Sequence, residues 1–142
     1  MPTSTRFAVA AHILAFLAAD RETAQPSEAI AASIRTNPAV VRRLLGELSR
    51  AGLTRSQLGK GGGARLAKGP KKITLLEIFQ AVEEPGLVAM HRAAPSDGCV
   101  IGRNIQGALQ EVTAEAEKAF FQVLAQRTLK DVMKSIKLAE AA

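Results

Sequence analysis

The sequence predicts a mainly α-helical fold, a winged helix-turn-helix with a small two-stranded β wing and a long C-terminal dimerisation helix. Three observations support this prediction. Two helical segments are separated by a very short turn, a glycine-rich turn between two strand-like runs follows them, and a late segment carries one narrow apolar seam. The length of 142 residues fits a single domain, or a small domain with one extra element.

The chain begins with three predicted helices. Apolar residues recur at helical spacing through residues 5–19, which predicts the first helix. Ser27 is expected to cap a short helix over residues 28–33, and Asn37, followed by a proline, is expected to cap a third helix over residues 38–51. Two helices joined by so short a turn form a helix-turn-helix, whose second helix enters the major groove of DNA.

The third predicted helix has an apolar stripe and a basic face. It ends at Gly52, a residue type that commonly follows the last helical turn. Arg42, Arg43 and Arg50 lie off the apolar stripe, and the first two are near the helix N-terminus, where a recognition helix places the side chains that reach base edges. Alternatively, these arginines form only a solvated face. The short helix before them and the hairpin after them favour recognition.

A predicted hairpin follows directly. Strand-like runs over residues 53–58 and 64–67 flank the glycine-rich stretch 59–63, and a hairpin after a helix-turn-helix is a wing. Because glycine has no side chain, this tip can approach the DNA backbone or minor groove closely. The glycines also fit a nucleotide-loop pattern, but no helix follows them, which disfavours a nucleotide site. Phosphate contacts are expected from Arg55, Lys60, Arg65, Lys68, Lys71 and Lys72.

The second half is predicted to be helical apart from one connector. Thr74 and Glu77 fit a capping box that opens a helix reaching Val82. From Ile105, apolar residues spaced by four and three residues predict one long helix with a narrow apolar seam, and such a seam needs a partner, which predicts a homodimer. Thr128 is expected to cap a terminal helix with Ile136 facing inward. The seam, and thus the expected dimer interface, comprises Ile105, Leu109, Val112, Ala116, Phe120 and Val123.

These elements predict three regions: a winged helix-turn-helix DNA-binding domain over residues 1–83, a connector over residues 84–103 and a helical dimerisation region over residues 104–142. Charge is divided unevenly along the chain. Residues 1–72 hold twelve basic and four acidic side chains, a net charge of +8, whereas residues 73–142 hold seven basic and nine acidic, a net charge of −2. The basic half is therefore expected to meet a polyanion and the other half a partner.

Composition excludes several classes of protein. One cysteine cannot form a disulfide framework and two histidines do not support a four-ligand zinc site, so we expect no metal and a reducing, cytoplasmic location. Tryptophan and tyrosine are absent, which disfavours stacking on single-stranded nucleic acid. The apolar run over residues 7–19 is too short to span a bilayer and fits a buried helix better than a secretory signal. No constellation of catalytic groups is present, so we predict no enzyme activity.

Four segments resemble the Rrf2 family of bacterial winged-helix transcription regulators. They are residues 37–53, the wing at 59–67, the helix start at 73–78 and the late segment 128–132, and the resemblance covers nearly the whole chain. Members of this family include iron-sulfur assembly, nitric-oxide-sensing and cysteine-metabolism repressors. The resemblance implies a homodimer on double-stranded DNA at an inverted-repeat operator, with two recognition helices in successive major grooves and the wings at the flanking minor grooves.

The resemblance also suggests which residues contact DNA. By position, Ala39, Arg42 and Arg43 resemble the family's base-reading sites, and arginines there favour guanine. Two departures lie in the wing: Leu58 stands where some members carry a minor-groove arginine, for which Lys60 is a substitute, and Ala64 stands where the family often has tyrosine. The expected DNA-contacting residues are Ser27, Asn37, Ala39, Arg42, Arg43, Arg50, Arg55, Lys60, Gly61, Gly62 and Arg65.

The cysteine content departs furthest from the family. Cluster-binding members carry three cysteines between the fourth helix and the dimer helix, whereas this sequence has only Cys99 and is similar to a cluster-free subgroup. No iron-sulfur cluster or other cofactor is therefore expected. A helix start and Arg103 favour a reactive thiolate, while Asp97 opposes it. Cys99 is then either a sensor of oxidants or electrophiles, or a small residue packed at the dimer interface.

The sequence thus predicts a sequence-specific regulator of transcription that binds double-stranded DNA, a repressor with thiol-based sensing at Cys99. One alternative is a helical protein-interaction module whose basic half does not read DNA. Another is a binder of anionic membranes, which is disfavoured because the basic residues gather around a hairpin and a short helix.

Overall fold

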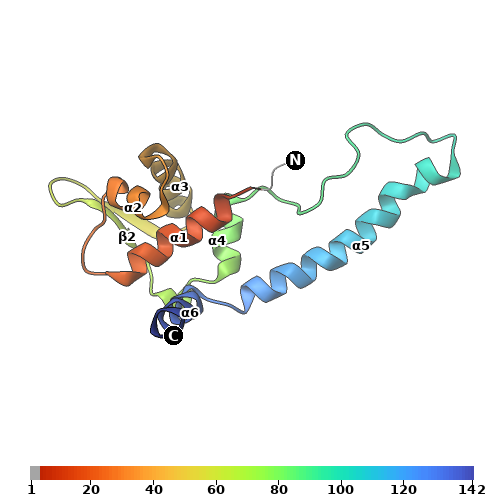
Figure 1. Cartoon of the computed structure of the whole chain (residues 1–142). Helices are drawn as coiled ribbons and strands as arrows, with labels where there is room; N and C mark the ends of the chain where they lie inside the picture. Colours follow the sequence, from red (N-terminus) through yellow and green to blue (C-terminus); the bar gives the residue numbers. More distant parts are fainter. Residues whose placement is uncertain (1–3) are drawn as a thin grey trace. The chain divides into compact units, whose positions relative to one another are not determined.

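A computed structural model describes residues 4–142 and confirms the predicted fold class (Figure 1). Six α-helices and one two-stranded sheet are present in this part of the chain. The helices are α1 (Arg6–Ala19), α2 (Ser27–Ile34), α3 (Pro38–Arg50), α4 (Leu75–Val82), α5 (Val100–Ala125) and α6 (Leu129–Ala141). The strands are β1 (Thr54–Gln57) and β2 (Gly63–Leu66), and a short 3-10 helix, η1, spans Pro70–Lys72.

The chain divides into two compact units. The first, the winged-helix unit, contains the residues up to Glu83 together with Leu124–Ala142, and the second contains Glu84–Val123. In the first unit, α1 packs against α2, α3, α4 and α6 around one hydrophobic core. Its largest fully buried side chains are Ile13, Leu14, Leu17, Ile30, Val41, Leu44, Leu48, Leu53, Ile73, Ile78 and Leu129. Helix α3 is therefore fixed by the same core as the rest of this unit.

Helices α2 and α3 form the predicted helix-turn-helix. The turn begins at Arg35, whose backbone is left-handed with φ of 65° and whose N–H donates to the Ala31 carbonyl at 2.8 Å. Asn37 caps α3 as predicted, because its side-chain oxygen accepts the Ala39 N–H at 2.8 Å and Pro38 occupies the first helical position. Helix α3 thus begins at a position defined by its own sequence.

The predicted capping role of Ser27 is wrong. Ser27 is the first helical residue of α2, and Pro26 precedes the helix in an extended conformation with no side-chain cap. The reason is tertiary, because the backbone of Gln25 exchanges two hydrogen bonds with Ala64, at 3.0 and 2.8 Å. This bridge ties the residue before Pro26 to the wing, so the chain turns into α2 one residue earlier than the capping pattern indicates.

Strands β1 and β2 pair in antiparallel register to form the predicted wing, with Gln57 opposite Gly63 next to the tip. Two glycines at the tip are required by close backbone contacts. A Cβ atom on Gly62 would lie 2.3 Å from the Gln57 carbonyl oxygen, and one on Gly63, whose φ is 150°, would lie 2.3 Å from the Gln25 carbonyl oxygen. The glycine-rich sequence therefore sets the wing's shape and its join to α2.

The C-terminal segment returns to the winged-helix unit by backbone hydrogen bonds. The Leu75 N–H donates to the Arg127 carbonyl and the Leu129 N–H donates to the Ile73 carbonyl, both at 2.9 Å. Capping boxes at Thr74 and Thr128 start α4 and α6 as predicted. Helix α6 also lies close to α1 and η1, so its first turns complete the core of the winged-helix unit.

Ile136 does not face inward as predicted. Its side chain is 51% exposed, whereas Leu129 at the start of α6 is fully buried and Val132 is half-buried. The burial therefore declines along the helix: α6 meets the core through its first turns and extends beyond it. Helical spacing correctly identified one face of α6, but not the length over which that face is covered.

The second unit consists of the connector and most of α5. Helix α5 begins at Val100, five residues before the predicted start at Ile105. Hydrogen bonds stabilise its first turn without apolar packing. The Arg103 N–H donates to the Cys99 carbonyl at 2.9 Å, and the Asn104 side chain donates to the Val100 carbonyl at 2.8 Å. Apolar periodicity could not detect a turn stabilised in this way.

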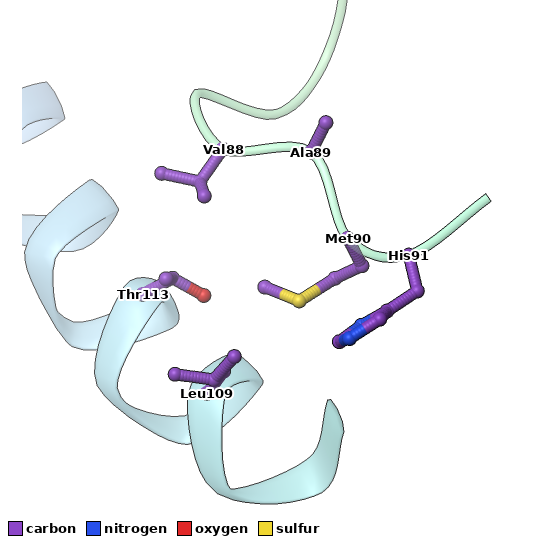
Figure 2. Close-up of a pocket in the computed structure, with 6 residues that line it drawn as sticks. All are labelled: Val88, Ala89, Met90, His91, Leu109 and Thr113. Atoms are coloured by element: carbon purple, nitrogen blue, oxygen red, sulfur yellow. The ribbon is translucent and has the colours of Figure 1, made fainter. Parts of the chain in front are cut away.

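The connector lies along α5 within this unit. The Leu87 N–H donates to a Glu117 carboxylate oxygen at 2.8 Å. Figure 2 shows the hollow next to this contact, which has a volume of about 340 Å³. Connector residues thus contact the helix well before the chain reaches Cys99. The hollow is lined by Val88, Ala89, Met90, His91, Leu109 and Thr113.

Helix α5 presents its apolar seam to solvent in the single chain. Leu109 is 42% exposed, Val112 65%, Phe120 38% and Val123 58%. None of the helices in residues 4–142 is long and apolar enough to cross a membrane.

Candidate nucleic-acid interface

Helix α3 buries one face and exposes another. Val41, Leu44 and Leu48 are buried in the core, which turns Arg42 and Arg43 outward. Ala39 is also exposed, one turn before them, and its small side chain leaves the helix N-terminus open. This arrangement places two guanidinium groups and an uncrowded first turn on the exposed surface of α3, which suits contact with base edges.

A groove separates α3 from the wing. It has a volume of about 550 Å³. Arginine and serine side chains line much of it, so it offers charged and hydroxyl donors suited to phosphate oxygens. Its lining includes Ser27 from α2, Arg42, Ser49 and Arg50 from α3, and Ser56 and Leu58 from the wing. The structure thus brings three expected DNA-contacting residues, Ser27 of α2 and Arg42 and Arg50 of α3, to one concave surface, whereas the wing residues that line it were not among those expected.

An acidic side chain lies beside one of these arginines. Nη1 of Arg42 is 3.6 Å from Oε1 of Glu28, which belongs to the first turn of α2. Both side chains are more than half exposed, so water screens the pair and it stabilises the fold very little. Its main effect is on the surface itself, because Glu28 reduces the positive potential next to Arg42.

Two of the expected cations form bonds within the winged-helix unit instead of pointing freely outward. The Arg65 guanidinium donates to the Glu22 carbonyl in the loop between α1 and α2. Lys68 pairs with the Glu77 carboxylate at 2.7 Å. The other expected cations are exposed and therefore more accessible to DNA phosphates, namely Arg55, Lys60, Lys71 and Lys72. Sequence alone could not distinguish these two groups of cations.

The pairing of Lys68 also affects the pKa of Glu77. Partial burial raises the pKa of this carboxyl, but hydrogen bonds from Lys68 and Thr74 outweigh it and lower the pKa below its ordinary value. The carboxylate form is therefore favoured in the folded chain. Its contribution to folding stability is present above the unfolded pKa and is lost as the pH falls through the folded one.

The sequence analysis missed an ion pair that joins α1 to α3. Nη2 of Arg6 lies 2.5 Å and 2.7 Å from the two carboxylate oxygens of Glu47. Arg6 begins α1 and Glu47 lies in the second half of α3, so the pair joins helices 41 residues apart. No local motif could have revealed it, because neither residue has a distinctive neighbour in the sequence.

Cys99 lies immediately before α5, in the second unit. Its side chain is exposed, and the backbone N–H groups of Gly102 and Ile101 donate to its sulfur. These bonds lower the pKa of the Cys99 thiol below its ordinary value. The Arg103 guanidinium donates to the Asp97 carbonyl at 2.9 Å, so the pKa of Cys99 is lowered by these two backbone N–H groups and not by the expected charge of Arg103.

Comparison with known proteins identifies the family. The model of the Rrf2 family, described as an iron-dependent transcriptional regulator, matches residues 3–135. The chain belongs to the Rrf2 family. YwnA of Bacillus subtilis (strain 168), whose provisional designation is HTH-type transcriptional regulator, is 42% identical over 131 residues, which cover 92% of this chain and 96% of YwnA.

Solved structures agree with this assignment to the Rrf2 family. A crystal structure provisionally described as that of a DNA binding protein is 40% identical, with a TM-score of 0.73 over 90% of this chain and 98% of that one. The IscR protein of T. potens is 22% identical, with a TM-score of 0.74 over 100% of this chain and 93% of that one, and shares its fold. The chain is thus a transcriptional regulator with the Rrf2 winged-helix fold.

The family description names iron, which raises the question of a metal centre in this Rrf2 regulator. Iron-sulfur clusters are held mainly by cysteine thiolates, usually four. The sequence supplies one cysteine, and residues 4–142 contain no group of three or more histidine, cysteine, aspartate or glutamate side chains placed to hold a metal ion. The donor set of a single chain does not fit a cluster.

Proposed function

We propose that this Rrf2 regulator is a homodimeric repressor that acts in the cytoplasm on an inverted-repeat operator. Helix α3 enters the major groove and the wing contacts the neighbouring minor groove. The observation that carries the proposal is the groove between them, which holds Arg42 and Arg50 beside serine hydroxyls from α2, α3 and β1. A DNA strand lying in this groove would meet donors on both sides.

Base recognition follows from the part of α3 that leads into this groove. Arg42 and Arg43 are exposed near the helix N-terminus, and each guanidinium can donate two hydrogen bonds to the major-groove edge of guanine. Asn37 and Ala39 stand before them, where backbone and small side chains allow close approach. Within the wing, Arg55 and Lys60 are exposed beside the glycine tip and supply phosphate contacts.

A second copy of the chain is the proposed partner of α5. Val112 and Val123 are more than half exposed, and a contiguous exposed apolar surface marks an interaction site. Ile105, Leu109, Ala116 and Phe120 extend the same seam along the helix. Pairing two such helices would present two recognition helices to one operator, which is why we expect the operator to be an inverted repeat.

The signal is proposed to act at Cys99, without a bound cofactor. Its thiolate would attack one oxygen of a peroxide, the O–O bond would break, and the products would be a sulfenic acid and, after proton uptake, water or an alcohol. Exposure of the sulfur and its two backbone donors support this step. The protein's role is thus to bind and respond, and no reaction turned over by the protein is proposed.

Salt-dependent binding tests the proposal as a whole. Fragmented genomic DNA is captured with the full-length protein and sequenced, and the affinity for an enriched site is then measured from 50 to 200 mM salt. About six phosphate contacts predict a slope near −5 for log affinity against log salt concentration. Enrichment of an inverted repeat with such a slope supports a DNA-binding regulator. Affinity that hardly changes with salt, or no enrichment, would favour a helical protein-interaction module.

Oxidation separates the sensing step from DNA binding. The capture is repeated after mild treatment with hydrogen peroxide, using the native chain and Cys99→Ser. We expect oxidation to change retention of the enriched site for the native chain only, while both reduced proteins bind with equal affinity. An unchanged response in Cys99→Ser would remove the thiol from the mechanism and leave the repressor itself intact.

A further inference from the structure

Leu58 is an apolar side chain in a polar surface. It is 91% exposed, and the next most exposed large apolar side chain in residues 4–142, Ile101, is 69% exposed. An exposed leucine contributes almost nothing to folding, so the packing of the chain does not account for it. Its position does, because Leu58 follows β1 directly and precedes Gly59, where the wing turns with φ of 85°.

Leu58 also borders the groove that contains Arg42 and Arg50. Arg55 and Lys60 flank it in the sequence and are exposed as well. The side chain therefore stands within the basic surface, on the side of the wing that faces α3. A ligand of this surface must therefore accommodate several positive charges and also one branched alkyl group.

The minor groove of DNA offers such an environment. Phosphates line its edges, while sugars form its walls, and apolar side chains are found inserted there in several architectural proteins. On its floor, A·T pairs expose only acceptors, whereas a G·C pair adds the guanine amino group. A leucine pressed against that amino group would remove it from water without offering an acceptor, which costs free energy.

We propose that Leu58 is a specificity residue that selects, under the wing, base pairs without a minor-groove amino group. This inference rests on the proposed function, because it requires the wing to lie in the minor groove. It adds a sequence preference to a part of the protein that would otherwise contact only the DNA backbone. The preference comes from exclusion of an amino group and not from a hydrogen bond.

Base analogues test this selection directly. Within an enriched operator, single pairs in the flanks are changed one at a time to A·T, inosine·C, G·C or 2,6-diaminopurine·T. Inosine·C presents the major-groove edge of G·C without the minor-groove amino group, and diaminopurine·T presents that of A·T with it. We expect A·T and inosine·C to bind equally, and the two amino-bearing pairs to bind about tenfold more weakly at the wing position.

Variants at Leu58 assign the preference to this side chain. In Leu58→Ala the four duplexes should bind within about twofold of one another, while Leu58→Met, which keeps an apolar contact, should retain the ranking. Leu138→Ala removes an apolar side chain that is 65% exposed on α6 and should change nothing. Because Leu58 is almost fully exposed, unfolding curves of all variants should coincide with that of the native chain.

The outcomes distinguish the two proposals. Equal affinities for A·T and diaminopurine·T, which share a major-groove edge, would show major-groove recognition and overturn the role of Leu58. A ranking of the four duplexes that is unchanged in Leu58→Ala would overturn it as well. Salt-dependent binding to the operator with all four duplexes equal would also overturn it, while leaving the proposed function in place. Failure to bind any operator would overturn both.

Discussion

One nitrogen of the Arg6 guanidinium lies within 2.7 Å of both carboxylate oxygens of Glu47, and this contact joins the first turn of α1 to α3, the proposed recognition helix. Glu47 is 20% exposed and Arg6 41% exposed, so the pair is partly shielded from water. Most other contacts of α3 with the core are apolar, made by side chains such as Val41, Leu44 and Leu48, and they have no directional preference of their own. The ion pair therefore helps to set the orientation of α3 about its own axis.

Replacing Arg6 by Met should weaken folding and DNA binding together. We expect a loss of a few tenths to about 1 kcal/mol in the free energy of unfolding, because solvent screens part of the attraction. A double-mutant cycle with Glu47→Gln, followed by urea denaturation and by operator binding, isolates the pair. If the effects of the two single substitutions add in the double variant, for both the free energy of unfolding and the DNA affinity, Arg6 and Glu47 are not energetically coupled.

Replacing Glu28 by Gln should strengthen DNA binding. The substitution removes a negative charge 3.6 Å from Arg42 on the groove, and little stability is lost because both side chains are exposed. We expect about a two- to fivefold rise in affinity at low salt that shrinks as salt increases. Glu140→Gln, which makes the same charge change near the C-terminus, is the matched control. Equal effects of the two substitutions would show that only net charge matters.

Arg43 and Lys60 should respond differently to replacement by Ala. Arg43→Ala is expected to cost about 1 to 3 kcal/mol on the operator and to relax the preference at one base pair. Lys60→Ala is expected to weaken binding to all sequences alike and to reduce the salt slope by about one. Titrations of operator and scrambled duplexes measure both effects. Equal losses on every duplex for Arg43→Ala would remove Arg43 from base recognition.

Gly63→Ala should destabilise the winged-helix unit more than Gly61→Ala. Both glycines have positive φ, so each substitution strains the backbone by about 1 to 2 kcal/mol. At Gly63 the added Cβ atom would also lie 2.3 Å from the Gln25 carbonyl oxygen, whereas at Gly61 nothing lies within 4 Å. Thermal unfolding of the two variants gives the comparison. Equal melting temperatures would mean that the Gln25 backbone moves away from position 63 at little cost in free energy.

The Cys99 thiol should become reactive at a lower pH in the folded protein than in the unfolded chain. Hydrogen bonds from the N–H groups of Gly102 and Ile101 lower the pKa of the folded thiol, so its thiolate forms at a lower pH than in the unfolded chain. The rate of alkylation by iodoacetamide, measured from pH 6 to 10, should therefore reach its midpoint at lower pH in the native protein than in urea. Coincident profiles would contradict the bonding at the sulfur.

Local motifs account for the elements that the sequence predicted well. Asn37 before Pro38, and Thr74 with Glu77, form hydrogen bonds that need only neighbouring residues, so their helices start where predicted. Ser27 fits the same kind of pattern, but the bridge between Gln25 and Ala64 determines where α2 begins. Contacts between distant segments, such as this bridge, leave no local signal.

The same distinction applies to the candidate interface. The outward position of Arg42 and Arg43 followed from the period of the apolar stripe on α3, which the core confirms. The packing of the wing and α4 in three dimensions determines two other contacts. Arg65 donates to the Glu22 carbonyl, and Lys68 pairs with Glu77. Sequence could therefore predict that the surface is basic, but not which cations are already engaged.

The hydrogen bonds of Arg127 and Leu129 to the chain near Ile73 have a consequence for synthesis. A nascent chain contains the whole recognition helix and wing long before these residues leave the ribosome, yet its core lacks Leu129 until then. Folding of the winged-helix unit during translation must therefore remain incomplete until the segment around Leu129 has left the ribosome. A transcript truncated within α5 would yield a product that contains α3 and the wing but has an incomplete core, which makes it a substrate for proteases.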